Sequence, residues 1–227
     1  MENIKLIAVD IDGVLLEDTF SPVLRNLIIH LGGEYNSEVE RHVFSRPQLE
    51  AASYVKRALN IEKSDEEIIN MFFMFRDDYM KTHEKGLIDG AADLLKMLSS
   101  INIKIVCYGG LSESQIVEEF NDYLPYFDQY ICTNDFRPGL REITKDYFGL
   151  EYSDVLFIDD VNSVAEEAKK LNAAFIGIPS SFEWGWQLKD MRKTNVKYIL
   201  NSVKDIDIDL LEKIDMGIVN NTIWSRN

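Results

Sequence analysis

The chain has 227 residues, enough for one large domain or for a core with a smaller insertion, and too many for a peptide or a tail. Its 39 Asp and Glu residues outnumber its 24 Lys and Arg residues, which gives a formal net charge of −15. Such a chain repels a phosphate backbone, so we expect no nucleic-acid partner. Hydrophobic residues make up 46% of the sequence, which excludes a disordered chain.

The apolar runs and the cysteines indicate a cytoplasmic protein. The first apolar run, Ile4–Val9, is interrupted by Asp10 before it reaches the length of a signal peptide. No later run reaches the roughly 18 residues that suggest a membrane helix. Cys107 and Cys132 have neither the spacing of a zinc site nor that of a disulfide framework. We therefore expect a reducing compartment and no membrane contact, while the oligomeric state stays open.

The first predicted element is a buried strand over Ile4–Val9, and a helical insertion follows it. Residues 16–87 contain four helix-like stretches and no convincing strand. Helix starts within the insertion are indicated by proline or by a capping box: Pro22, Pro47, and Ser64 with Glu67. The run 71–75, Met-Phe-Phe-Met-Phe, is apolar on every face of a helix, which favours a central helix of a small bundle over a helix that lines a ligand site.

After the insertion, apolar runs alternate with helix-like segments. The predicted strands are 103–108, 130–133, 155–158 and 174–178, and the predicted helices are 112–123, 139–148 and 162–171. Ser112 with Gln115 and Ser163 with Glu166 fit capping boxes at two of these helix starts. Strands that alternate with helices predict an α/β fold, in which right-handed crossovers connect a parallel sheet. A weak strand and helix follow over 196–214.

Two acidic pairs follow predicted strands. Asp10 and Asp12 come at the end of the first strand, and Asp159 and Asp160 directly follow the strand 155–158. The carboxyl ends of parallel strands lie on one edge of a sheet, where open α/β sheets bind ligands. Taken alone, the first pair fits a solvated acidic turn equally well. Together, the four carboxylates favour a site for a hard cation such as Mg²⁺, if their strands are neighbours.

These motifs resemble those of the haloacid dehalogenase superfamily of phosphotransferases. Residues 10–15, Asp-Ile-Asp-Gly-Val-Leu, fit the first motif of the family, and 158–160, Ile-Asp-Asp, fit its acidic fourth motif. The insertion lies where members with a helical C1-type cap carry theirs, and the segment 90–98 is similar to the helix that returns from cap to core. The resemblance implies a Rossmann-like three-layer core over 1–15 and 88–227, with a helical-bundle cap domain over 16–87.

The resemblance also implies roles for the acidic residues. Asp10 would attack the phosphorus atom and form an aspartyl-phosphate, while Asp12 would protonate the leaving oxygen and later activate water. Members that cleave carbon–halogen or phosphonate bonds typically lack the second aspartate, so Asp12 favours phosphoester chemistry. The implied Mg²⁺ ligands are Asp10, the backbone carbonyl of Asp12, Asp160 and also Asp159.

Two positions depart from the motifs of the family. Gly109 stands where a Ser or Thr hydroxyl normally binds phosphate, although the backbone N–H groups that follow, from Gly110 onward, remain available to an anion. A plain turn between a strand and a helix explains these glycines equally well. Arg137, before Pro138, stands in the place of the lysine of the third motif and keeps its positive charge without its compact shape. A surface arginine is the alternative there.

Within the insertion, Arg46 is similar in position to the specificity loop of related sugar-phosphate mutases and phosphatases, and we predict that it binds a remote anionic group; a solvated charge is the alternative. The three histidines have no ligand spacing and receive no role. Trp184 and Trp186 are expected to pack.

The sequence thus predicts a Mg²⁺-dependent phosphatase that acts on a small phosphorylated metabolite. The departures at Gly109 and Arg137 keep open a binding or regulatory protein without efficient chemistry. A sugar phosphomutase is the third reading.

Overall fold

The computed structural model describes residues 1–83, 86–116 and 118–224, so residues 84–85 of the predicted insertion, residue 117 and residues 225–227 lie outside the description. A parallel sheet of six strands forms the centre, in the order β3-β2-β1-β4-β5-β6. The strands are β1 (Leu6–Asp10), β2 (Lys104–Gly109), β3 (Gln129–Cys132), β4 (Val155–Asp159), β5 (Ala174–Gly177) and β6 (Tyr198–Ile199). The predicted α/β fold with a parallel sheet is therefore confirmed.

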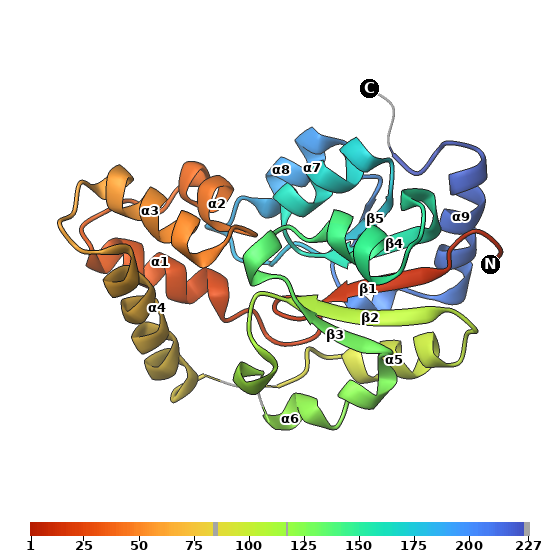
Figure 1. Ribbon diagram of the computed structural model, residues 1–227, viewed down its shortest axis with the longest axis horizontal. Helices are drawn as coiled ribbons and strands as arrows, with labels where there is room; N and C mark the ends of the chain where they lie inside the picture. The colour runs from red at the N-terminus through yellow and green to blue at the C-terminus, as the bar shows by residue number, and fades with distance from the viewer. Residues whose placement is uncertain (84–85, 117, 225–227) are drawn as a thin grey trace.

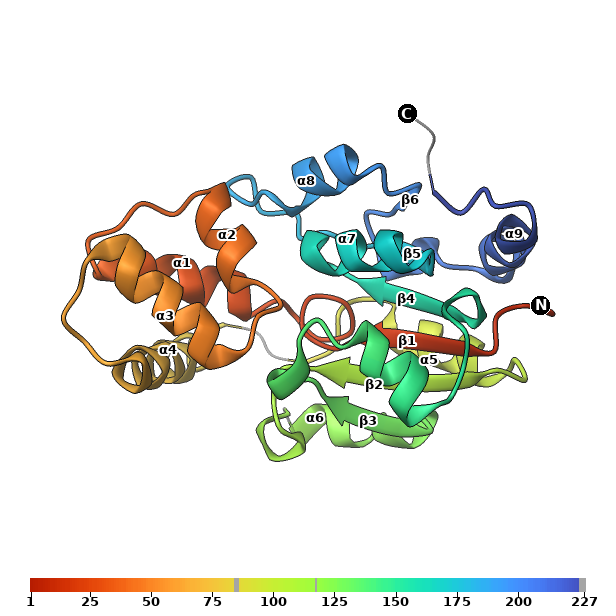
Figure 2. The same ribbon diagram turned by 45° about the horizontal axis from the view of Figure 1, so that its top comes forward.

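Helices cover both faces of the sheet, as Figures 1 and 2 show. Alternate residues of β1 point to opposite faces: Ile7 and Val9 join one hydrophobic cluster, and Leu6 and Ala8 join the other. The first cluster includes α5 (Ala91–Ser99) and α9 (Ile208–Val219), and the second includes α7 (Asn162–Leu171) and α8 (Gln187–Thr194). Both faces are thus buried, as the continuous apolar runs of the strands require.

Four of the five helices described between β1 and β2 lie together beyond one end of the sheet (Figures 1 and 2). They are α1 (Phe20–His30), α2 (Ser37–Val43), α3 (Gln48–Leu59) and α4 (Asp65–Met80). The predicted capping box at the start of α4 is present: Ser64 Oγ accepts from the Glu67 N–H at 3.1 Å, and Glu67 Oε2 accepts from the Ser64 N–H at 2.7 Å. We call residues 16–87 the helical insertion and the remainder the core; this division stays a prediction.

Two chain segments connect the helical insertion to the core and lie side by side. Leu16 pairs with Leu87 as an isolated antiparallel bridge. The Glu17 N–H donates to the Gly86 carbonyl at 3.1 Å, and the Ile88 N–H donates to the Leu15 carbonyl at 2.9 Å. Both connections therefore leave the core at one place, next to the loop that follows β1.

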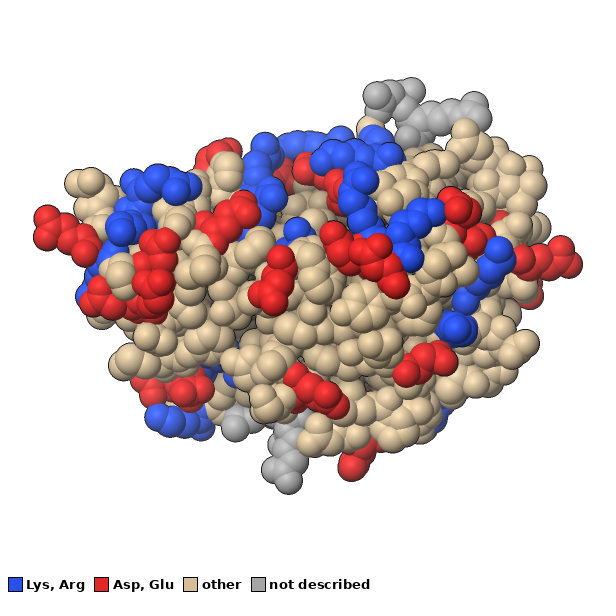
Figure 3. All heavy atoms as spheres, in the orientation of Figure 1, with Lys and Arg blue, Asp and Glu red and all other residues tan. Residues whose placement is uncertain are grey.

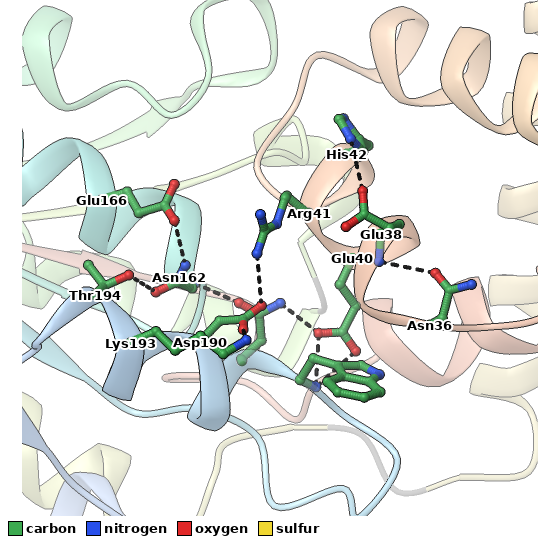
Figure 4. Close-up of polar contacts among 12 residues, drawn as sticks. Asn36, Glu38, Glu40, Arg41, His42, Asn162, Glu166, Asp190, Lys193 and Thr194 are labelled. Atoms are coloured by element: carbon green, nitrogen blue, oxygen red, sulfur yellow. Dashed lines mark hydrogen bonds and ion pairs between the residues drawn. The ribbon is translucent and has the colours of Figure 1, made fainter.

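A second contact between the helical insertion and the core involves α2 and the start of α8 (Figure 4). The buried carboxylate of Glu40 accepts from the Trp186 N–H at 3.0 Å and from the side-chain amide of Gln187 at 2.7 Å. Next to it, Arg41 and Asp190 form an ion pair at 3.8 Å. We call this contact the α2–α8 seam.

Trp184 packs against the helical insertion in the same region, in agreement with its predicted packing role. Its ring stacks on Phe182 at 4.5 Å and meets the edge of Tyr35 at 5.4 Å. The Arg25 guanidinium lies 5.2 Å from the centre of the Trp184 ring. The aromatic residues after β5 thus help to hold the insertion in place.

Two predictions about helix starts and lengths are wrong. Ser163 is not an N-cap, because α7 begins one residue earlier, and the Ser163 hydroxyl donates instead to the Phe44 carbonyl at 3.4 Å. The continuous helix predicted over 112–123 is broken into a short 3₁₀ turn, Glu113–Gln115, and the four-residue α6, Glu118–Asn121. In the predicted helix 139–148, residues Glu142–Tyr147 adopt the wider π-type turn.

The prediction that 71–75 forms the central helix of a bundle is also wrong. Only Ile68 is fully buried in α4, and Met74 is 66% exposed. Phe72 and Phe73 are half-buried and line a cavity. The alternative, a helix that lines a ligand site, fits the structure better.

The surface seen in Figure 3 carries acidic and basic side chains interspersed among other residues, and Lys and Arg atoms gather along its upper edge above α7 and α8. None of the helices in the described ranges has the length and apolar character needed to cross a membrane.

Candidate active site

The acidic pairs meet at one edge of the sheet because β1 and β4 are neighbours. Val9 pairs with Ile158, so Asp10 and Asp159 end adjacent strands. Asp12 lies in the loop after β1, and Asp160 lies between β4 and α7. Asp10, Asp12 and Asp160 line the same cavity. Three of the four predicted carboxylates therefore line one cavity, and the fourth, Asp159, lies close enough to act on the pKa of Asp10.

Gly13 allows Asp160 to lie against the loop that follows β1. A Cβ atom built at residue 13 would lie 2.5 Å from Asp160 Oδ2, and residue 13 has a φ of +91°, which disfavours any other residue. The carboxylate of Asp160 thus lies beside the backbone of residues 12 and 13. This close approach is the geometric reason for the glycine in the first motif.

Asp10 and Asp160 are both buried, with 6% and 4% of their surface exposed. Burial raises the pKa of Asp10 well above its ordinary value, the carboxylate of Asp159 acts in the same direction, and Arg137 opposes them. The pKa of Asp160 is raised well above its ordinary value by burial, and next by Asp159. The charged forms of both residues therefore require a cation for compensation.

Asp12 combines burial with a weak backbone contact. Burial raises the pKa of Asp12 to about 7, and the charge of Asp18 acts in the same direction. The Thr19 N–H opposes this shift and donates to Asp12 Oδ1 at 3.3 Å. Near neutral pH such a carboxyl group can both give and accept a proton, as a general acid and base must.

Asp159 has a different environment. Its Oδ2 accepts from the Tyr108 hydroxyl at 2.5 Å, and its Oδ1 accepts from the Val161 N–H at 2.8 Å. It is also absent from the residues that line the cavity. Both of its oxygens have protein donors, which favours a positioning role over the predicted role as a metal ligand.

The donor set fits Mg²⁺ better than a metal held by protein side chains alone. Within residues 1–83, 86–116 and 118–224, no three Asp, Glu, His or Cys side chains form a group that could hold a metal ion. Mg²⁺ commonly takes one or two carboxylates and completes its octahedron with water and substrate phosphate oxygens. Asp10 and Asp160 provide two such carboxylates, and the Asp12 carbonyl adds a further oxygen of the predicted set.

Ile11 explains the glycine at position 109. A Cβ atom at residue 109 would lie 2.5 Å from Ile11 Cγ2, so a serine or threonine has no room there without a shift. Gly109 and Gly110 both line the cavity. The departure from the family motif thus follows from packing between the loops after β1 and β2.

Gly110 leaves space for Arg137. A Cβ atom at residue 110 would lie 2.1 Å from Arg137 Nη2, and Arg137 Nη1 donates to Ser45 Oγ at 3.2 Å. Arg137 lines the cavity and acts to lower the pKa of Asp10, although burial and Asp159 together raise it. The guanidinium therefore lies near the predicted nucleophile, where the alternative of a surface arginine does not fit.

The cavity has a volume of about 140 Å³ and extends from these residues into the helical insertion. Arg46 lines it; its buried Nε makes no hydrogen bond but lies 4.0 Å from Glu50 Oε1, with which it forms an ion pair. Several lining residues were not expected from the sequence: Asp18, Thr19, Phe20, Arg76 and Asn134. A sequence signal existed only for Asp18, which precedes Ser21 by three residues as a cap does and accepts from its N–H at 2.9 Å.

Comparison with solved structures places this architecture among known folds. No protein-family model and no curated protein matches the sequence. A β-phosphoglucomutase from Clostridium difficile superposes with a TM-score of 0.70 at 13% identity, over 96% of this chain and 99% of that one. A haloacid dehalogenase-like hydrolase from Streptococcus pneumoniae gives 0.65 at 16% identity, over 94% and 100%.

The chain has the haloacid dehalogenase fold. A predicted phosphoglycolate phosphatase from Haemophilus somnus agrees, with a TM-score of 0.64 at 14% identity over 94% of this chain and 99% of that one. The resemblance read from the motifs is therefore confirmed for the fold. The roles of Asp10, Asp12, Asp159, Asp160 and the other site residues stay predictions.

Proposed function

We propose that the chain is a Mg²⁺-dependent phosphatase of the haloacid dehalogenase type, which hydrolyses a small phosphate monoester. The observation that carries this proposal is the convergence of Asp10, Asp12, Asp160 and Arg137 on one cavity at the carboxyl edge of the sheet. Phosphoryl transfer needs a nucleophile, a proton donor and positive charge around the phosphoryl oxygens, and these four side chains provide them together with a metal ion.

In this proposal a carboxylate oxygen of Asp10 attacks phosphorus, and the bond from phosphorus to the ester oxygen breaks. Asp12 gives its proton to the leaving oxygen, which departs as an alcohol. Asp12 then takes a proton from water as that water attacks phosphorus, which releases inorganic phosphate and restores Asp10. Mg²⁺ bound by Asp10, the Asp12 carbonyl and Asp160 would offset the charge of the phosphoryl group.

Arg137 and the backbone N–H groups of the loop after β2 would bind the phosphoryl group in place of the side chains that the altered motifs lack. The guanidinium lies beside Gly110, where it can bind a phosphoryl oxygen, and the backbone N–H groups of the loop after β2 can bind another. The helical insertion would act as a cap, because its residues form the rest of the cavity. Water would then be excluded from the site during phosphoryl transfer.

The test is turnover of generic phosphate monoesters in the presence of Mg²⁺. Asp10→Asn removes the nucleophile and is expected to lower kcat by about 10³-fold or more while the circular dichroism spectrum stays unchanged. Asp122→Asn, at an exposed carboxylate outside the cavity, serves as the matched control and is expected to retain full activity. Equal turnover by Asp10→Asn and wild type would refute the nucleophile assignment.

Two alternatives have specific support. Solved structures named β-phosphoglucomutase share this fold, so transfer of the phosphoryl group to a second hydroxyl is the runner-up; isomerised sugar phosphate would identify it. The missing hydroxyl at Gly109 supports a protein that binds phosphate without turnover. Binding of Mg²⁺ without hydrolysis of any ester in a broad screen would favour that reading.

A further inference from the structure

The cavity has two chemically different ends. The core end carries the carboxylates and Arg137, whereas the end within the helical insertion is formed mainly by apolar side chains. We call six of these side chains the apolar wall: Phe20, Leu24, Phe44, Val55, Phe72 and Phe73. A phosphoryl group bound at the core end would thus direct its leaving group toward the apolar wall.

Aromatic contacts fix the shape of the apolar wall. The rings of Phe20 and Phe44 meet edge to face with centroids 5.1 Å apart, and Phe20 contacts Phe72 at 5.2 Å. Phe72 and Phe73 meet edge to face at 5.6 Å. These rings come from α1, the end of α2 and α4, so three elements support one preformed apolar surface.

Several polar atoms of insertion residues that line the cavity have no hydrogen-bond partner, namely Asp18 Oδ2, Thr19 Oγ1 and Arg46 Nε, whereas others are bound to residues of the core. Ser45 Oγ already accepts from Arg137, and Asn134 Oδ1 accepts from the Gln48 N–H at 3.3 Å. The apolar wall itself has no polar side-chain atom, so the hydroxyls of a sugar that face this wall would lose their hydrogen-bond partners, each at a cost of about 1–3 kcal/mol.

The volume limits the size of the leaving group. The cavity measures about 140 Å³, and an apolar protein cavity of about 150 Å³ is known to hold benzene. The phosphoryl group takes part of this volume, so the remaining space suits a leaving group no larger than a six-membered ring.

We propose that the site takes phosphate monoesters whose leaving group is apolar and no larger than a six-membered ring, in preference to sugar phosphates. The inference rests on the proposed function for turnover, but its binding preference is testable without turnover.

The first experiment compares benzyl phosphate with a hexose 6-phosphate, both esters of a primary alcohol, at saturating Mg²⁺. We expect a kcat/KM for benzyl phosphate that is about 100-fold or more higher, because the apolar wall binds the ring and leaves hydroxyls unpaired. Equal or faster turnover of the hexose phosphate would overturn the inference and leave the phosphatase proposal intact.

Variants of α4 distinguish the loss of a contact in the apolar wall from a general loss of protein stability. Phe72→Ala is expected to raise KM for benzyl phosphate about 10-fold or more and to raise KM for the smaller ethyl phosphate much less. Met74→Ala, on the same helix but at a 66% exposed side chain, is the matched control and should change neither ester. Ala51→Phe, which fills the cavity from α3, should likewise reduce turnover of benzyl phosphate selectively. Equal losses for both esters in both wall variants would contradict the inference.

Binding of phosphonates, which are not hydrolysed, keeps the two proposals distinguishable. Calorimetry of the wild-type protein with Mg²⁺ should give at least about 10-fold tighter binding of benzylphosphonate than of methylphosphonate. If no ester is hydrolysed but this preference is present, the phosphatase proposal fails and the inference stands. Equal affinities of the two phosphonates would overturn the inference.

Discussion

The space around residue 109 determines which side chains the loop after β2 can carry. Ile11 Cγ2 would lie 2.5 Å from a Cβ atom there, so Gly109→Ser is expected to lower the free energy of unfolding by about 1–3 kcal/mol. Ile11→Ala removes the obstructing methyl group, although it costs stability itself because Ile11 is buried.

The double variant tests whether these two residues compete for one space. Denaturant unfolding of Gly109→Ser, Ile11→Ala and the double variant should show a loss in the double variant that is smaller than the sum of the single losses by about 1 kcal/mol or more. Additive losses would show that Ile11 does not restrict residue 109.

At the residue scale, the sequence predicted the acidic side chains and the two arginines Arg46 and Arg137, but not the apolar side chains that line the cavity. Asp10, Asp12 and Asp160 are recognisable because each follows a strand end on the same sheet edge. Phe20 and Phe72 lie far apart in the sequence, and their contact at 5.2 Å depends on how α1 packs against α4. No periodicity specifies such a contact between elements.

A single carboxylate attaches the N-terminal segment to α9. Asp215 Oδ1 accepts from the backbone N–H groups of Asn3 at 2.9 Å and Ile4 at 2.8 Å, and Oδ2 accepts from the Glu2 N–H at 3.0 Å. Burial acts to raise the pKa of Asp215, but the N–H groups of Ile4, Glu2 and Asn3 lower it below its ordinary value. The charged form is therefore the one that stabilises the fold.

Asp215→Asn is expected to lower the free energy of unfolding at pH 7 by about 1–3 kcal/mol, the range for hydrogen bonds to a charged group. Since the folded pKa is lowered, this stabilisation is fully present above the unfolded pKa of about 3.9 and is lost as the pH falls through the folded value. The difference between wild type and variant should therefore shrink below about pH 4.

Glu212→Gln, at an exposed carboxylate on the same helix, is the matched control and should change the unfolding free energy by less than about 0.5 kcal/mol. A difference between Asp215→Asn and wild type that stays constant from pH 7 to pH 3 would contradict the role of the charge.

At the element scale, the strands were predictable to within about two residues, because buried parallel strands are continuous apolar runs between loops. The segment 112–123 was not, because its spacing fits a continuous helix, whereas Ile116 has an extended backbone and ends the 3₁₀ turn Glu113–Gln115 before α6 begins. The prediction that Ser163 caps α7 is wrong for another reason. The N–H of Asn162, the first residue of α7, donates to Gln187 Oε1 at 2.6 Å, an acceptor from an element distant in the sequence.

Over the whole molecule, several contacts hold the helical insertion on the core, among them the hydrogen bonds from Arg137 to Ser45 and from Ser163 to Phe44. The paired connections at Leu16 and Leu87 and the α2–α8 seam are two more. The proposed catalytic side chains come from the core, whereas the apolar wall comes from the insertion. The relative position of the two parts therefore sets the size of the cavity.

Glu40→Ala is expected to weaken the α2–α8 seam. It leaves the Trp186 N–H and the Gln187 amide without their acceptor, at a cost of about 1–3 kcal/mol for each buried group. Hydrogen–deuterium exchange should rise in residues 184–188 and in α2 while the strands stay protected. Glu38→Ala, at an exposed position on α2, is the control; similar exchange in both variants would show that Glu40 does not hold the insertion.

The most direct test of the proposed site is the binding of Mg²⁺ in the presence of inorganic phosphate, measured by calorimetry. We predict one Mg²⁺ per chain, with an affinity that rises when phosphate is present, because the phosphate oxygens complete the coordination. Asp160→Asn should abolish this binding, and Asp122→Asn should retain it. Absence of Mg²⁺ binding in the wild type, or unchanged binding by Asp160→Asn, would contradict the arrangement proposed for Asp10, Asp12 and Asp160.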